Sequence, residues 1–232
     1  MKLNKLIAIA TISLLSGGIS MAQKALNLED IVAGNIIQTK GIGSMTWLKD
    51  GERYSRLENN KQTGGTDIVA YRAKDNSREV IIPSSLLTDK STGRPIPVRS
   101  VSWSADNEKV LIYNNTRRVW RYDTRGDYWV LNLKDGALRQ LGKGMPESSM
   151  MFAKFSPDGT RVAYVSNNNI YVEDIDSGKI TQLTKDGSDT IVNGTFDWVY
   201  EEEFSCRDGF RWSPDGKHIA YWQSDTKGTG VF

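Results

Sequence analysis

A repeated turn sequence constrains the fold of this chain more than any other feature. Each copy places an aromatic residue before a Ser-Pro-Asp-Gly-like turn and an apolar strand after it. Three clear copies and one weaker copy are present: VSWSADNEKVLIYNN from Val101, AKFSPDGTRVAYVSN from Ala153, FRWSPDGKHIAYWQS from Phe210, and MTWLKDGERYSRLEN from Met45. In such turns Pro presets φ, Asp bonds the local backbone and Gly tolerates positive φ. The anchoring aromatics lie 52 to 57 residues apart: Trp47, Trp103, Phe155 and Trp212.

Each repeat contains more than one hairpin. Alternating strands follow the copy that begins at Ala153, with a second turn at 176–178, and the same pattern surrounds Asp135-Gly136. Each repeat therefore carries about four short strands, and four-stranded units at this period are typical of β-propeller blades. Because one twisted blade cannot cover both of its faces, neighbouring blades stack around an axis. We predict an all-β fold, a partial β-propeller; a β-sandwich with a coincidental repeat is the alternative.

The repeats also predict how the domain is divided. Blades are expected near residues 41–97, 98–149, 150–187 and 209–232, and the last holds only its first strands. A closed propeller needs at least about four complete blades. About three and a half blades therefore predict the leading part of a longer protein. Residues 188–209 form an insertion that belongs to no blade and can begin a short helix, with Thr195 or Asp197 as its N-cap.

The N-terminal residues form a separate segment. Residues 1–22 have the layout of a secretory signal peptide: two lysines, an apolar run over 6–15, and small residues before a cut ahead of Gln23. A buried N-terminal helix is the alternative. The apolar run is too short for a permanent membrane span, so no membrane anchor is expected. Residues 23–40 would form a lead-in segment. This start and the lack of disulfides favour an exported bacterial protein, periplasmic or secreted.

Charge and residue counts exclude several classes of site. The chain has 30 Lys and Arg against 28 Asp and Glu, and the predicted signal peptide carries two of the lysines. The remaining net charge of zero gives no support for a nucleic-acid partner. Cys206 and His218 are the only residues of their types, which excludes an intrachain disulfide and a usual Cys/His zinc site. No metal or other cofactor is expected. No Gly-x-Ser-x-Gly elbow is present, so no catalytic triad is expected in these residues.

The stretch DWVYEEEF, residues 197–204, differs from its strand-rich surroundings because three like charges adjoin one another. One interpretation is a solvated acidic turn at a helix start, where acids suit the helix dipole. The other is a binding site, because two carboxylates can satisfy most of the three donors of a primary ammonium. The second interpretation predicts recognition of a free amino terminus or a lysine-like ligand. Trp198 and Tyr200 would wall this site or pack beneath it.

DWVYEEEF closely resembles the glutamate motif of the dipeptidyl peptidase IV group of prolyl oligopeptidase-type (S9) serine peptidases. The resemblance implies that Glu202 and Glu203 bind the free N-terminus of a substrate, whereas Glu201 is not the usual amine ligand. TRRVWRYDTRGDYWVLN resembles, more loosely, the segment whose arginine holds a substrate carbonyl. Its Trp-Arg pair matches Trp120-Arg121. A solvated strand residue beside Asp123 is the alternative for Arg121, and three other arginines compete with it: Arg117, Arg118 and Arg125.

The same resemblance implies what the whole enzyme would do. It implies an eight-bladed propeller followed by an α/β-hydrolase domain, which is absent here, so this chain alone would be inactive. The whole enzyme would release Xaa-Pro or Xaa-Ala dipeptides through a serine nucleophile, with tripeptide release left open. Expected partners are peptides with a free N-terminus, the hydrolase domain and a second copy in a homodimer. The alternative from another class is a non-enzymatic periplasmic propeller that binds or scaffolds.

Overall fold

The computed structural model describes residues 27, 28, 32, 41 and 43–230. The predicted signal peptide, residues 1–22, and most of the lead-in segment, residues 23–40, lie outside this part. The chain divides into two units, Met1–Ile42 and Gly43–Phe232, and all of the described strands lie in the second. No helix in the described ranges is long and apolar enough to cross a membrane.

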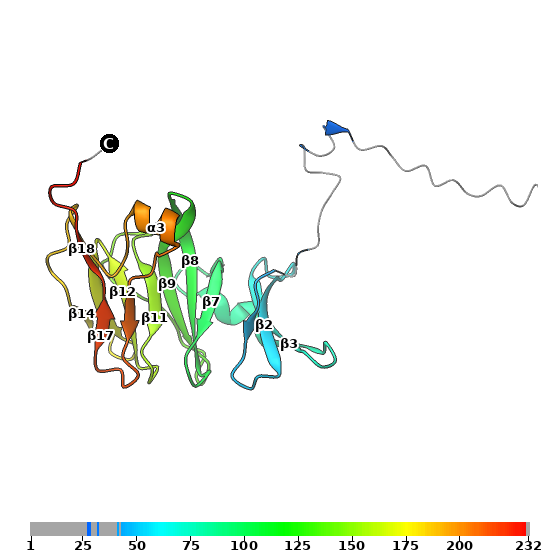
Figure 1. The fold of residues 1–232 in the computed structure, drawn as a ribbon. Coiled ribbons are helices and arrows are strands. Elements are labelled where there is room, and N and C mark those ends of the chain that lie inside the picture. The colour runs from blue at the N-terminus through cyan, green and yellow to red at the C-terminus, as the bar shows by residue number, and fades with distance from the viewer. Residues whose placement is uncertain (1–26, 29–31, 33–40, 42, 231–232) are drawn as a thin grey trace, which may run out of the picture. The chain divides into compact units, whose positions relative to one another are not determined.

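Three four-stranded antiparallel sheets follow one another along the chain. The first contains β1 (Thr46–Trp47), β2 (Arg53–Asn59), β3 (Thr66–Arg72) and β4 (Arg78–Ile82). The second contains β7 (Ser100–Trp103), β8 (Lys109–Val119), β9 (Tyr122–Asn132) and β10 (Leu138–Gln140). The third contains β11 (Met151–Phe155), β12 (Arg161–Ser166), β13 (Asn169–Asp174) and β14 (Ile180–Gln182). Figure 1 shows these sheets side by side in chain order.

The remaining strands form shorter pairs. A small link between the first two sheets contains η1 (Ser84–Leu87), β5 (Thr88–Asp89) and β6 (Arg94–Pro95). After the third sheet, β16 (Phe210–Trp212) pairs with β17 (Ile219–Tyr221). β15 (Ile191–Asn193) pairs antiparallel with β18 (Gln223–Asp225). The start of the predicted insertion is therefore hydrogen-bonded to the chain that follows β17.

The repeated turns explain why the strands begin and end where they do. β1, β7, β11 and β16 each end at one of the anchoring aromatics. In the copy that begins at Ala153, Ser156 Oγ donates to Asp158 Oδ1 at 2.5 Å and accepts the Arg161 amide at 3.0 Å. Gly159 supplies the positive φ, 67°, that the turn requires. The copies that begin at Val101 and Phe210 repeat the serine–aspartate bond at 2.6 Å. Polar turn chemistry thus fixes the register of each first hairpin.

The core lies between the sheets, and strand periodicity assigns residues to it. On β8, Val110 and Ile112 pack against the first sheet, whereas Leu111 packs toward the third. On β12, Tyr164 faces the second sheet and Val165 faces β16. Every central sheet therefore buries both of its faces, as stacked blades do. The predicted all-β class with four-stranded blades is confirmed; the total of eight blades stays a prediction.

One hairpin is longer than the sequence predicts. β8 and β9 have 11 residues each and extend beyond their sheet, with Trp120-Arg121 at the turn. The register of the hairpin shifts between Asn114 and Arg117, which indicates a bulge. Tyr113 Oη lies 2.7 Å from the carbonyl oxygen of Asp123 and 2.9 Å from that of Arg125, and so bridges this irregular part. The tip of the hairpin lies beside helix α3 (Figure 1).

Candidate functional site

The insertion forms the short helix α3, Trp198–Phe204. Asp197 is its N-cap, and its carboxylate accepts the Tyr200 amide at 3.1 Å. Ser205 ends the helix in the left-handed conformation, with φ of 53°. Thr195, the other predicted cap, instead donates its hydroxyl to the Arg207 carbonyl at 3.1 Å. The predicted helix is confirmed, and its cap is Asp197.

The three glutamates point in different directions because consecutive helix residues are roughly 100° apart. Glu201 is 5% exposed, and the side chain of Glu202 is 10% exposed. Glu203 is exposed. A solvated acidic turn therefore describes Glu203 alone. The helix places one carboxylate inside the protein, one at the boundary and one in solvent.

Arg121 forms an ion pair with Glu202, with 2.9 Å between Nε and Oε2. The other carboxylate oxygen, Glu202 Oε1, is buried and has no hydrogen-bond partner among the residues that the structure describes. The Arg121 side chain is 71% exposed, so its remaining N–H donors face solvent. Arg121 lies in the hairpin turn, and Asp123 pairs with Arg99 at 3.2 Å. Arg121 thus lies in a turn rather than on a strand, its side chain is mostly exposed, and its role in substrate binding stays a prediction.

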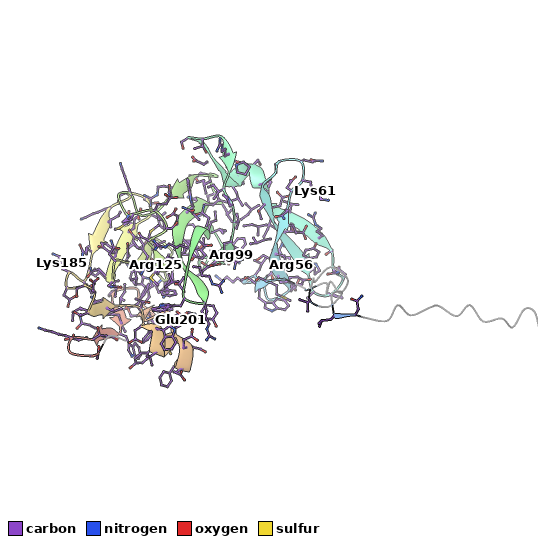
Figure 2. All side chains as sticks on the ribbon, turned by 90° about the horizontal axis from the view of Figure 1, so that it is seen from above. Arg56, Lys61, Arg99, Arg125, Lys185 and Glu201 are labelled. Atoms are coloured by element: carbon purple, nitrogen blue, oxygen red, sulfur yellow. The ribbon has the colours of Figure 1, made fainter. Side chains whose placement is uncertain are left out.

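Glu201 points about 100° away from Glu202 around the helix, toward the protein interior. Burial raises the pKa of its carboxyl, while the nearby charge of Arg207 lowers it and that of Glu202 raises it. Within the described part of the chain, Glu201 Oε1 has no hydrogen-bond partner. Glu201 lines a cavity of about 280 Å³ together with Asp197 and Arg125. Figure 2 shows Arg125, from β9, and Glu201, from α3, near one another.

Two further hollows adjoin the hairpin tip and the helix. One, of about 440 Å³, is lined by Arg99, Tyr122 and Asp123 among others. The second, of about 650 Å³, is lined by residues before and after α3, including Phe196 and Trp222. Phe152 and Arg207 line both hollows. The first hollow therefore reaches the hairpin tip at Tyr122, whereas Arg121, Glu202 and Glu203 line neither hollow.

The aromatic residues of the motif have separate positions. Tyr200 stacks on Phe196, with ring centroids 5.3 Å apart, and Phe204 lies 5.7 Å from Tyr200. Trp198 is 50% exposed. Tyr200 thus packs on the ring that precedes the helix, and Trp198 extends into solvent.

Sequence reasoning did not find every residue at this site. Arg207 belongs to no motif, and Tyr122 follows Arg121 with no signal of its own, yet their side chains touch. His218 is exposed and precedes β17. In the part of the chain that the structure describes, no group of three or more His, Cys, Asp or Glu side chains is arranged to hold a metal ion.

Comparison with known proteins identifies the family. The family model of the dipeptidyl peptidase IV N-terminal region matches residues 104–232, more than half of the chain. The chain belongs to this family. The match includes the hairpin with Arg121 and the helix with its three glutamates. The recognition of a dipeptidyl peptidase IV-like propeller region from the sequence is confirmed.

Similar proteins carry related names. A probable dipeptidyl-aminopeptidase B from Chaetomium globosum is 35% identical over 133 residues, which is 57% of this chain and 14% of that protein. One from Aspergillus terreus is 28% identical over 220 residues, which is 90% of this chain and 24% of that protein. The crystal structure of Porphyromonas gingivalis dipeptidyl peptidase 4 matches with a TM-score of 0.72 and 26% identity, over 88% of this chain and 28% of that one. The chain thus spans a quarter or less of the length of these two curated relatives.

These relatives correct one prediction. The curated proteins named above are fungal, which points to a eukaryotic protein, so the predicted bacterial periplasmic location is wrong. The prediction failed because an apolar N-terminus and a missing disulfide do not distinguish bacterial from eukaryotic proteins. The comparisons also do not favour the alternative of a non-enzymatic scaffold.

Proposed function

We propose that this chain is the part of a dipeptidyl peptidase that recognises the free N-terminus of a peptide substrate. In this proposal Glu202 and Glu203 bind the ammonium group, and Arg121 binds a backbone carbonyl of the same substrate. An α/β-hydrolase domain outside these residues supplies the serine nucleophile. The whole enzyme releases Xaa-Pro or Xaa-Ala dipeptides.

The unpartnered, buried oxygen of Glu202 is the observation that supports an ammonium site most directly. Arg121 occupies Oε2 of Glu202, whereas the buried Oε1 has no partner among the described residues. A buried carboxylate oxygen without a donor costs free energy, which a ligand donor would recover. Glu203 follows on the same helix and is exposed, so it can approach the same ligand from solvent. A primary ammonium has three donors, enough to bond both carboxylates.

Arg121 is suited to the carbonyl because its guanidinium is only partly used. The ion pair employs Nε, and the side chain is 71% exposed. The terminal N–H groups can therefore donate to a substrate oxygen while Nε stays on Glu202. The residue that would bind the substrate amine, Glu202, and the residue that would bind the carbonyl, Arg121, are thus held together by one ion pair. Such a clamp would fix how far the scissile bond lies from the N-terminus and so would favour release of a short unit.

The test is substitution of the two carboxylates in the complete protein. We expect Glu202→Gln and Glu203→Gln each to lower kcat/KM for an Xaa-Pro chromogenic substrate by roughly 10- to 100-fold, because a hydrogen bond to a charged group contributes about 1.5–3 kcal/mol. Glu79→Gln is the matched control, because Glu79 pairs with Arg53 on the exposed face of the first sheet. Release of dipeptide at the original rate by both variants would refute the proposal.

A further inference from the structure

A second contact joins the β8–β9 hairpin to the segment that carries α3. The guanidinium carbon of Arg207 lies 4.0 Å from the ring centroid of Tyr122, within the range of a cation–π interaction. Tyr122 is the first residue of β9 and directly follows Arg121. Arg207 comes three residues after the last residue of α3. The hairpin therefore meets the helix segment at two adjacent residues, Arg121 and Tyr122.

The backbone around Arg207 is firmly held. The Arg207 carbonyl accepts the Thr195 hydroxyl at 3.1 Å, and Thr195 forms a β-bridge with Asp208. Lys154 Nζ, from β11, pairs with Asp208. The Gly209 amide donates to the Gly194 carbonyl at 3.1 Å. Arg207 thus extends from a fixed part of the fold, whereas Tyr122 belongs to a hairpin that projects beyond its sheet.

The charges around Arg207 favour this position of its side chain. Arg207 lies near enough to Glu201 to lower the pKa of that buried carboxyl. Glu201 shares its cavity with Asp197, Asp189 and Arg125, so the acids outnumber the cation there. The guanidinium is therefore attracted toward the helix by Glu201 while its face covers the Tyr122 ring.

We propose that Arg207 is a positioning residue for substrate binding: by stacking on Tyr122 it holds the hairpin tip against α3 and keeps Arg121 on Glu202. This inference rests on the proposed function. Arg121 itself is mostly exposed and has a long, flexible side chain. Screening weakens exposed ion pairs, so the pair with Glu202 alone holds the hairpin tip weakly. The stacking of Arg207 on Tyr122, the residue after Arg121, restricts the backbone from which Arg121 extends.

The test compares Arg207→Gln and Tyr122→Leu in the complete protein. Each should raise KM for a free-N-terminus Xaa-Pro substrate by roughly three- to thirty-fold, the range that corresponds to one cation–π contact. Labelling of the active-site serine by a fluorophosphonate probe, which carries no amine, should keep its rate. Tyr122→Phe retains the ring and should restore the original KM. Arg72→Gln is the matched control, because Arg72 pairs with Glu52 on the exposed surface of the first sheet.

A double-mutant cycle makes the test independent of general structural damage. Because both changes remove the same contact, the double variant should raise KM no more than the more damaging single variant. KM effects that multiply, or single variants that leave KM unchanged, would overturn the inference. If Glu202→Gln and Glu203→Gln lower kcat/KM while these variants do not, the proposed function stands and only the role of Arg207 fails. If the glutamate variants also have no effect, the proposed function itself fails.

Discussion

The hydroxyl of Tyr113 offers a direct test of how the fold supports the site. Its oxygen lies 2.7 Å from the Asp123 carbonyl oxygen and 2.9 Å from that of Arg125, on the strand opposite the bulge. A phenol has one proton, so these distances describe one donor shared between two acceptors. Burial raises the pKa of Tyr113 to about 12, which keeps the proton in place near neutral pH. Tyr113→Phe removes this donor and leaves two carbonyls without it.

The expected cost follows from that geometry. Loss of a partner from a partly buried acceptor costs about 1–3 kcal/mol, which raises the equilibrium constant for local opening of the hairpin roughly 5- to 150-fold. The Tyr113 ring packs closely on the backbone beside these carbonyls, because Gly126 has no Cβ that would clash with the ring. The loss should therefore appear as faster hydrogen exchange of amides in residues 117–126, measured by mass spectrometry on the complete protein.

Tyr71→Phe is the matched control. Tyr71 also donates to an oxygen, Glu58 Oε1, but in the first sheet, away from the hairpin. Its removal should change exchange only in the strands of that sheet. Unchanged protection of residues 117–126 in Tyr113→Phe would refute the reasoning that this hydroxyl holds the hairpin together.

Two further predictions concern stability. Phe210→Ala should destabilise the protein by about 3–5 kcal/mol in urea denaturation, because Phe210 is 1% exposed and fills the core between the third sheet and β16; a loss below about 1 kcal/mol would contradict this. Hydrogen bonds from Ser156 and Thr160 lower the pKa of Asp158 from 3.8 to about 2, so its ionised form stabilises the folded state above pH 3.8 and this contribution is lost as pH falls toward 2. Asp158→Asn should remove that part of the acid dependence of the urea midpoint, and an unchanged acid dependence would contradict the assignment.

The sequence predicted the features that local chemistry determines. Ser-Pro-Asp-Gly turns and alternating apolar residues depend on neighbours a few positions away, so the strands that end at Trp47 and Phe155 could be placed from the pattern alone. The helix at the glutamate motif was predicted for the same reason, because Asp197 caps it locally. The ion pair of Arg121 with Glu202 could not be predicted from local chemistry, because the two residues lie 81 positions apart. The family resemblance named both as substrate-binding residues but did not pair them.

The features that the sequence did not predict depend on contacts across the fold. The pairing of β8 with β9 continues past a bulge that the Tyr113 hydroxyl bridges, and no turn signal marks this bulge. The contact of Arg207 with Tyr122 joins two segments that lie far apart in the chain and has no repeat or motif. The burial of Glu201 could not be read from the sequence, because three consecutive glutamates give no sign of which one is buried. These glutamates differ only in the direction in which the helix points each side chain.

The contribution of a ligand's amino group to binding decides whether α3 is an ammonium site. Inhibition constants would be measured for an aminoacyl-pyrrolidide and its desamino analogue, on the original protein and on the double variant Glu202→Gln/Glu203→Gln. If α3 binds the amine, the amino group should improve inhibition of the original protein roughly 100-fold, the equivalent of one or two charge-assisted hydrogen bonds, and should give almost no advantage in the double variant. An equal advantage in both proteins would contradict the account, because the amine would then bind elsewhere.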